Sequence, residues 1–326
     1  MSRVAVVFTG GTIGSQFDAG SGGNVPKLDG AAILARTPGL SEIAEVVPID
    51  RGFTAASHFT FPYMFGLADT VRTALESPDV DGCVVTQGTD SIDESSFFLD
   101  LVLTGPKPVV VTGAMRSASE AGYDGPANLR DAVRAAADPA LRDQGVVVVV
   151  ARSIDAADDV TKTHATALET FRSLNLGPLG RIEGDRVVLL RRRAGRRQVR
   201  TGRAAERVHL ITAHAAIDGT LVDAAMTIGA DGFVVAAHGA GNTDPRLLEA
   251  CSRAMAAGLP VVLTTRCAAG QVGPFYGFPG AGAQWIRAGA LPAGYLGGPK
   301  ARVALALGIG AGLDREGLAG LLADPA

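Results

Sequence analysis

Hydroxyl, amine and carboxylate side chains occur at three places in this chain where they could carry out nucleophilic chemistry. Thr12 follows two glycines in TGGTI, at the end of an apolar run. Thr89 and Asp90 follow Gly88 in QGTDS, again after an apolar run, and Lys162 stands between two threonines in DVTKT. A hydroxyl that attacks an amide needs a base to take its proton and donors for the developing oxyanion. The three segments together offer these groups.

The two glycines before Thr12 do not belong to the common nucleotide-binding turns. Gly10 and Gly11 do not fit the spacing of the dinucleotide fingerprint G-x-G-x-x-G, and the lysine of a phosphate-binding loop does not follow them. The chain also contains no G-x-S-x-G nucleophile elbow. Two glycines would let the backbone approach a ligand closely and present N–H donors to an oxyanion. Open α/β sheets bind ligands at such strand ends.

Each of these residues also has a purely structural interpretation. Thr12 could simply cap the next segment, and Asp90 could stabilise the following helix as an N-terminal carboxylate by about 0.3–1 kcal/mol. Ser91 and Glu94 have the spacing of a capping box for that helix. Lys162 would serve as a base only where burial and neighbouring groups keep it partly neutral. Two strand ends that both offer Gly-Thr favour the catalytic interpretation.

Apolar runs that alternate with helical patterns predict the elements that would position these residues. The predicted strands of the N-terminal part span residues 3–9, 43–49, 82–88, 108–114 and 145–151. Helices are predicted at 61–77, 93–103 and 126–138, and a Gly-Asp turn predicts a hairpin over 180–192. Continuous Val and Ile runs between helices are typical of a parallel sheet covered on both faces.

The C-terminal part repeats this pattern on a smaller scale. Strands are predicted at 208–214, 231–239 and 259–265, and helices at 245–258 and 299–312. The expected fold class is therefore α/β, with a larger N-terminal parallel-sheet domain and a smaller C-terminal α/β domain. We expect the smaller domain to be built on a four-stranded layer.

An arginine-rich segment separates the two parts. Residues 191–207 lack apolar periodicity and are interpreted as a solvated linker between an N-terminal catalytic domain, 1–190, and a C-terminal domain, 208–326. A patch for an anionic partner is the alternative, but no aromatic residues are interleaved with the arginines. The formal net charge of −3 and the pI of about 6.0 also do not favour nucleic acid as a partner.

Other features of the sequence indicate a cytoplasmic setting. Three cysteines give no disulfide framework. No signal-peptide pattern precedes the first predicted strand, and no apolar run is long enough to span a membrane, so no membrane partner is expected. The histidines do not have the spacing of a zinc site, so no metal is expected; they are His58, His164, His209, His214 and His238.

Six short motifs connect the chain to a known family. They are TGGTI (9–13), GTDS (88–91), GAMR (113–116), DGPANL (124–129), DVTKT (159–163) and GPLG (177–180). With these motifs the sequence resembles the bacterial L-asparaginase and glutaminase-asparaginase family over nearly its whole length, in the same order and spacing. Each motif is short, but together they are highly specific.

The resemblance implies an amidohydrolase with a threonine nucleophile. Family members hydrolyse the side-chain amide of asparagine, a small-molecule substrate, and to varying degrees that of glutamine, without a metal or organic cofactor. Thr12 matches the nucleophile of the first motif. Thr89, Asp90 and Lys162 match a second set, a Thr–Lys–Asp array.

The resemblance also implies which residues bind the substrate. Ser57, in AASHF, is similar to the serine that holds the α-carboxylate, and His58 follows it where a Gln is common. Asp90 would bind the α-ammonium, and Ala114 would place its carbonyl near the leaving amide. The backbone of Gly11 and Gly88 would complete the same site.

Three departures from the family pattern stand out. The lid after the first motif, residues 14–28, contains Phe17 but not the usual Tyr. Gln87 precedes Gly-Thr-Asp where the family often has His. Residues 268–313 contain no Asp or Glu, although many members borrow a Glu from a neighbouring subunit to bind the α-ammonium.

The resemblance further implies a homotetramer, built as a dimer of dimers. The acid-free stretch 270–289 is apolar enough to form part of an interface, with Phe275, Tyr276, Phe278 and Trp285 as anchors. The alternative is that this stretch packs inside its own domain.

Two other functions remain open from the sequence. An amide-binding module that has lost catalysis would explain the missing Tyr and Glu. The ammonia-producing subunit of a tRNA-dependent amidotransferase shares these motifs, but it carries an additional N-terminal domain. It would also need a basic surface that only residues 191–207 could provide.

Overall fold

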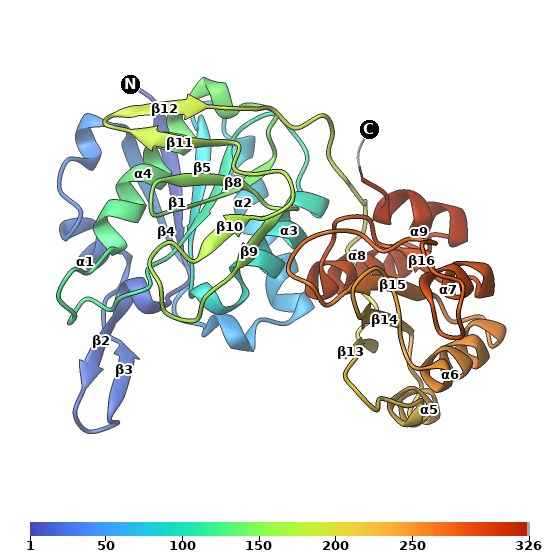
Figure 1. The fold of residues 1–326 in the computed structure, drawn as a ribbon. Helices are drawn as coiled ribbons and strands as arrows, with labels where there is room; N and C mark the ends of the chain where they lie inside the picture. Colours follow the sequence, from blue (N-terminus) through green and yellow to red (C-terminus); the bar gives the residue numbers. More distant parts are fainter. Residues whose placement is uncertain (325–326) are drawn as a thin grey trace. The chain divides into compact units, whose positions relative to one another are not determined.

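The computed structural model describes residues 1–324. The chain divides into two compact units, Met1–Arg196 and Arg197–Ala326, and the division falls inside the segment predicted as a linker. Each unit contains its own sheet with helices packed on it, which confirms the predicted α/β fold class (Figure 1).

The first unit is built on an eight-stranded sheet. In sheet order its strands are β12 (Arg186–Leu189), β11 (Gly180–Glu183), β8 (Ser153–Ala156), β7 (Val146–Val150), β6 (Val109–Thr112), β5 (Gly82–Thr86), β1 (Arg3–Phe8) and β4 (Glu45–Asp50). The predicted parallel arrangement is confirmed from β4 to β7. Beyond β7 the sheet is antiparallel, because β8 returns through a tight hairpin and β11 and β12 form the predicted hairpin.

Helices cover both faces of the parallel strands. They are α1 (Gly30–Ala35), α2 (Phe61–Glu76), α3 (Ile92–Val102) and α4 (Gly125–Ala137). On one face Leu129 and Val133 of α4 share a core with Val84 and Val110. On the other face α2 packs on β1 and β5, while α3 packs on β6 and β7 (Figure 1). Alternate strand residues are therefore buried on opposite faces, which explains the continuous apolar runs.

Two short hairpins project from this sheet. One pairs β2 (Ser15–Asp18) with β3 (Gly23–Pro26), and the other pairs β9 (Val160–Lys162) with β10 (Phe171–Ser173). The first lies within residues 14–28, the lid after the first motif, whose Gly and Ser content is typical of a mobile loop that closes over substrate. The expectation of a loop is wrong for these eight residues, because the glycines cluster at the tip of a hairpin rather than along its length.

The second unit contains the predicted four-stranded layer. Its parallel strands are β13 (Val208–Thr212), β14 (Gly232–Ala237), β15 (Val261–Thr265) and β16 (Leu291–Pro292). Its helices are α5 (Thr220–Thr227), α6 (Pro245–Ala256), α7 (Gly282–Ala288), α8 (Gly298–Gly310) and α9 (Arg315–Leu322). Across residues 1–324, none of the helices combines the length and the apolar character that a membrane span requires.

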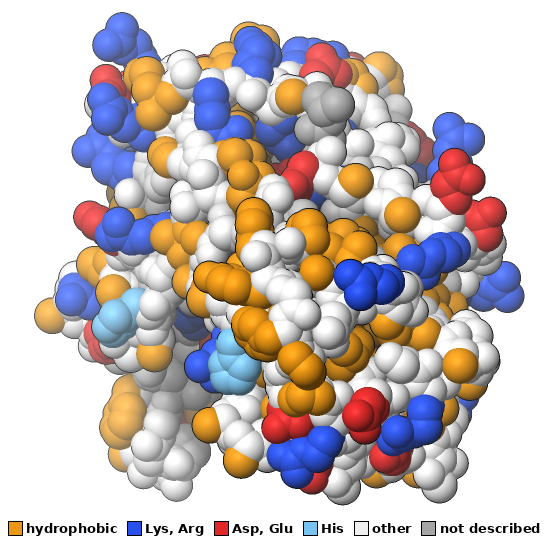
Figure 2. Space-filling view, turned by 45° about the vertical axis from the view of Figure 1, so that its right-hand side comes forward, with side chains coloured by type: hydrophobic (Ala, Val, Ile, Leu, Met, Phe, Trp, Pro, Cys, Tyr) orange, Lys and Arg blue, Asp and Glu red, His pale blue; other side chains and the backbone are white. Residues whose placement is uncertain are grey.

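One of the four aromatic residues predicted as interface anchors is internal. Trp285 is completely buried in the core of the second unit, and its Nε1 donates a hydrogen bond to Thr243 Oγ1 at 3.0 Å. Phe275, Tyr276 and Phe278 are exposed by 71%, 52% and 50%. The prediction is therefore wrong for Trp285, whose indole ring fills a core position. Apolar side chains gather on the face of the molecule shown in Figure 2.

The arginine-rich segment is not simply solvated. The side chain of Arg193 is 4% exposed, and its Nη2 lies 2.8 Å from Asp100 Oδ2 and 2.8 Å from Asp158 Oδ2. Arg196 Nη2 lies 3.0 Å from Asp100 Oδ1. The interpretation of a solvated linker is wrong at these arginines, because they neutralise a carboxylate that is completely buried in α3.

Candidate active site

Four of the predicted site segments follow neighbouring strands of the large sheet. Thr12 follows β1, Thr89 follows β5, Ala114 follows β6, and Ser57 lies in the loop after β4. These strands are adjacent and parallel, in the order β6-β5-β1-β4. Their carboxyl ends therefore lie along one edge, where open α/β sheets bind ligands.

The turns that carry Thr12 and Thr89 are in direct contact through the backbone of their glycines. Gly10 and Gly11 both have φ of 95°, a left-handed conformation that favours glycine. A Cβ on Gly11 would lie 2.3 Å from the amide nitrogen of Gly88. Thr12 follows at once as the first residue of a short 3-10 turn, Thr12–Gly14, and it is partly exposed. The contact between the glycines therefore brings the turns of Thr12 and Thr89 together.

Lys162 connects Thr89 and Asp90. Its Nζ donates a hydrogen bond to Thr89 Oγ1 at 2.9 Å and lies 3.3 Å from Asp90 Oδ1. Thr89 is 5% exposed, whereas the side chains of Lys162 and Asp90 are 17% and 65% exposed. A pair with one partner this exposed stabilises the fold by at most about 1 kcal/mol. Its arrangement is thus better suited to chemistry or recognition than to holding the fold together.

The Ser91 half of the predicted capping box after Thr89 does not form. Ser91 precedes α3, but within the described chain its side chain makes no capping hydrogen bond. Instead Ser91 Oγ donates to the carbonyl oxygen of Ala56 at 2.8 Å. This bond ties the turn of Thr89 to the 3-10 turn Ala56–His58, which presents Ser57 and His58 to solvent.

The third turn packs under Thr89. A Cβ on Gly113 would lie 2.6 Å from the Gln87 carbonyl oxygen and 3.2 Å from Thr89 Cγ2. Ala114 is completely buried, and Asn128 Nδ2 donates to the Gly113 carbonyl oxygen at 3.0 Å. The structure thus brings the turns that carry Thr12, Thr89, Ser57 and Ala114 against one another.

Two positions that sequence reasoning left without a role help to hold these turns. Gln87 is completely buried, and its Oε1 accepts a hydrogen bond from Ser95 Oγ at 2.9 Å. The Asp124 carboxylate accepts hydrogen bonds from the amides of Met115 and Arg116, at 3.0 and 2.9 Å. Asp124 belongs to the motif DGPANL, so the motif could have indicated a residue that holds the turn after β6 in place.

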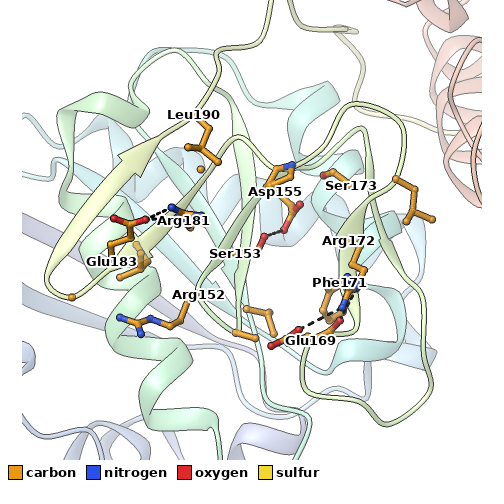
Figure 3. Close-up of a pocket in the computed structure, with 17 residues that line it drawn as sticks. Arg152, Ser153, Asp155, Glu169, Phe171, Arg172, Ser173, Arg181, Glu183 and Leu190 are labelled. Carbon is orange, nitrogen blue, oxygen red and sulfur yellow. Dashed lines mark hydrogen bonds and ion pairs between the residues drawn. The ribbon is translucent and has the colours of Figure 1, made fainter.

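A cavity of about 910 Å³ lies elsewhere on the first unit, between β8, β10 and β11 (Figure 3). Asp155 is 1% exposed there and accepts a hydrogen bond from Ser153 Oγ at 2.6 Å. Burial raises the pKa of Asp155, while the hydrogen bond from Ser153 opposes that rise. Of the described residues that line the cavity, none is a predicted site residue.

This cavity does border the strand that supports Lys162. Its wall includes Phe171 of β10, which pairs directly with Lys162 of β9. The cavity thus borders β10 of the hairpin that carries Lys162, whereas the predicted site residues lie at the carboxyl ends of the strands. We therefore place the candidate active site at the strand ends.

The assembled groups can support attack of a hydroxyl on a carbonyl carbon. Two threonines offer hydroxyls, Lys162 offers an amine within hydrogen-bonding distance of one of them, and the glycine turns offer backbone N–H groups. Within residues 1–324 no three His, Cys, Asp or Glu side chains are grouped so that they could hold a metal ion.

Comparison with known families agrees with this arrangement. The model of the asparaginase N-terminal domain matches residues 3–194, and the model of the glutaminase/asparaginase C-terminal domain matches residues 207–322. The chain belongs to the asparaginase family. The two matches together include every site segment described above.

Individual asparaginases are similar over nearly the full length. A probable L-asparaginase of Deinococcus radiodurans is 37% identical over 323 residues, which cover 97% of this chain and 95% of that protein. The L-asparaginase of Bacillus licheniformis is 30% identical over 94% of each chain. The crystal structure of a probable cytoplasmic L-asparaginase from Campylobacter jejuni superposes with a TM-score of 0.85, at 26% identity and 99% coverage of both chains.

Proposed function

We propose that this protein hydrolyses the side-chain amide of L-asparagine to aspartate and ammonia, with glutamine as a second substrate and without a cofactor. The observation that carries the proposal is the hydrogen bond from Lys162 to Thr89, beside the contact between Gly11 and Gly88. Its membership of the asparaginase family supports the amide as substrate, and its 29% identity to the glutaminase-asparaginase of Pseudomonas aeruginosa supports the second substrate.

In the proposed mechanism Thr12 is the nucleophile. Its hydroxyl attacks the amide carbon, and backbone N–H groups of the glycine turn stabilise the tetrahedral oxyanion. Ammonia leaves as the acyl-enzyme forms, and water then releases aspartate. The position of Thr12 directly after two glycines with φ of 95° supports this role, because a backbone without side chains lets a ligand approach its N–H groups closely.

Thr89, Lys162 and Asp90 are proposed to move protons. When Lys162 is neutral, the contact with Thr89 Oγ1 lets its amine accept a proton from that hydroxyl. The Asp90 carboxylate lies 3.3 Å from this amine and can accept a hydrogen bond from its protonated form. In the first half of the reaction Thr89 takes the proton of Thr12 as it passes its own to Lys162, and this proton is returned to the nitrogen that leaves as ammonia. In the second half the same array takes a proton from the attacking water and returns it to Thr12 as aspartate leaves.

Substrate binding is proposed to use the surrounding turns. Ser57 and His58 would hold the α-carboxylate, and their exposure beside Gly88 is compatible with that role. Asp90 would bind the α-ammonium, and the Ala114 carbonyl would accept from the amide nitrogen. The backbone of Gly11 and Gly88 would complete the walls of the site.

Ammonia release tests this function. The purified chain should release ammonia from L-asparagine in the presence of a metal chelator. A folded protein that is inactive on both asparagine and glutamine would instead be an amide-binding module. Activity that depends on a charged tRNA and a second subunit would indicate the amidotransferase alternative.

Asp90→Asn tests the recognition of the α-ammonium. We expect kcat/KM for asparagine to fall roughly 10- to 100-fold, since hydrogen bonds to charged groups contribute about 1.5–3 kcal/mol. Succinamic acid lacks the α-ammonium, so its kcat/KM should change much less. Asp93→Asn, in the first turn of α3, serves as the control. Equal losses on both substrates would show that Asp90 acts on the Thr89–Lys162 pair instead.

The protein is also proposed to be a cytoplasmic homotetramer. The cytoplasmic asparaginase of Campylobacter jejuni, similar over 99% of the chain, supports the location. The exposed rings of Phe275, Tyr276 and Phe278 support an interface, because the burial of large aromatic residues is a common source of binding energy. Light scattering at micromolar concentration should give the mass of four chains, and a monomer would contradict the proposal.

A further inference from the structure

Tyr123 reaches from the third turn to the residue that follows Thr12. Its Oη donates a hydrogen bond to the carbonyl oxygen of Ile13. Ile13 is completely buried, so this carbonyl group depends on a protein donor. Tyr123 belongs to none of the groups assigned above to binding or proton transfer, yet its hydroxyl binds the residue directly after the proposed nucleophile.

The hydroxyl of Tyr123 remains a donor at any pH at which the enzyme would work. Burial and the nearby carboxylate of Asp124 raise the pKa of Tyr123 to about 12. The phenol is therefore neutral between pH 5 and pH 9, and its proton stays available to the Ile13 carbonyl. A role for Tyr123 as an acid or base in this range is correspondingly disfavoured.

The ring of Tyr123 has little freedom to move. A Cβ on Gly125 would lie 2.4 Å from both Cε2 and Oη of Tyr123, so the ring rests directly on that glycine. The amide of Tyr123 donates to the carbonyl oxygen of Glu120 at 3.2 Å. Asp124, next to Tyr123, accepts hydrogen bonds from the amides of Met115 and Arg116 at the other end of the loop. The loop that carries the Tyr123 hydroxyl is thus fixed by hydrogen bonds at both of its ends.

The same loop also contacts the β2–β3 hairpin at alternate residues. The amide of Ala118 donates to the carbonyl oxygen of Ser15 at 2.9 Å. Ser119 Oγ accepts from the amide of Phe17 at 3.0 Å. Tyr123 makes the contact nearest to Thr12, whereas Ala118 and Ser119 hold the hairpin farther along. The effect of Tyr123 is therefore separable from that of the hairpin.

We propose that Tyr123 is a positioning residue that fixes the Thr12 hydroxyl for attack by holding the Ile13 carbonyl. This inference rests on the proposed role of Thr12 as the nucleophile. Without the hydrogen bond, the peptide between Ile13 and Gly14 is free to rotate, and this rotation moves the adjoining 3-10 turn that carries the Thr12 side chain. Misplacement of a reacting group by a fraction of an ångström slows the chemical step more than it weakens substrate binding.

Tyr123→Phe tests the proposal, because it keeps the ring and removes only the donor. We expect kcat on asparagine to fall about 10- to 100-fold, while KM stays within about twofold. Rapid-quench measurement should place the loss in the acylation step. Tyr63→Phe is the matched control, since the Tyr63 hydroxyl has no hydrogen-bond partner among the described residues.

Gly125→Ala provides a second variant that keeps the hydroxyl but crowds the ring. It should lower kcat in the same way as Tyr123→Phe. Unchanged kcat in Tyr123→Phe, or a loss confined to KM or to the melting temperature, would overturn the proposal. Thr12→Ala distinguishes a failure of the proposed nucleophile from a failure of the positioning role alone. If that variant stays active, the proposed nucleophile is wrong; if it is inactive while Tyr123→Phe is normal, only the positioning role fails.

Discussion

Replacement of Thr12 by Ala is expected to lower kcat on asparagine by about 10³-fold or more, with the fold retained. The variant loses the proposed nucleophile, and water cannot replace a hydroxyl that is already held at the amide carbon. Thr89→Ala should show a loss of similar size, because residues that act as a unit are not additive. The double variant should therefore be little worse than either single variant.

Trapping the acyl-enzyme decides which threonine is acylated. The reaction should be quenched at low pH, which preserves an ester, and the digested protein analysed by mass spectrometry. We expect the aspartyl group on the peptide that contains Thr12. An acyl group on the peptide that contains Thr89, and none on that of Thr12, would reverse the roles, because Thr89 has the nearer base.

Serine variants provide the control for both positions. Thr12→Ser and Thr89→Ser keep a hydroxyl and remove one methyl group, so each should retain measurable activity that its Ala counterpart lacks. Loss of activity in Thr12→Ser equal to that in Thr12→Ala would indicate that packing of the methyl group, rather than the hydroxyl, is what matters there.

Replacement of Asp100 by Ala is expected to lower the free energy of unfolding by about 3–5 kcal/mol, the usual cost of breaking a buried ion pair by removal of one partner. Asp100 is completely buried, and its carboxylate lies against Arg193 and Arg196. It also accepts a hydrogen bond from the amide of Val146 at 2.9 Å. Its loss would remove a carboxylate from both arginines and the acceptor from the Val146 amide, and would leave Arg193 paired with Asp158 alone.

Urea unfolding followed by circular dichroism measures this loss. Trp285 is the single tryptophan of the chain and lies in the core of the second unit, so its fluorescence reports on that unit. Asp69→Ala is the control, because the Asp69–Arg72 pair is exposed and should contribute within about 0.5 kcal/mol. A loss below about 1 kcal/mol for Asp100→Ala would show that the arginines find water or other acceptors.

Much of the first unit was predictable because its parallel strands are apolar on both faces. The predicted strands at 3–9, 82–88 and 108–114 correspond to β1, β5 and β6. Because these strands are adjacent and parallel, Thr12, Thr89 and Ala114 lie at one edge of the sheet. Of the antiparallel strands beyond β7, the hairpin of β11 and β12 was predicted but β8 was not. Nothing in residues 153–156 shows that they return beside β7.

The errors in the prediction share a physical cause. Ser91 has the spacing of a capping residue but bonds to Ala56, which is distant in sequence. Trp285 stands among exposed aromatic residues but fits into its own core. Arg193 was interpreted as a solvated charge but forms an ion pair with the buried Asp100, which is distant in sequence. In each case a long-range partner, invisible to local patterns, decides the side chain's environment.

The contact between Gly11 and Gly88 also limits how this protein can evolve. A side chain on Gly11 would collide with the backbone of the opposite turn, and that backbone cannot retreat without moving Thr89. Random libraries at Gly11 should therefore yield almost exclusively the starting residue among active clones. Changes in substrate range must then arise at the exposed Ser57 and His58, or in the β2–β3 hairpin, where new side chains meet solvent first.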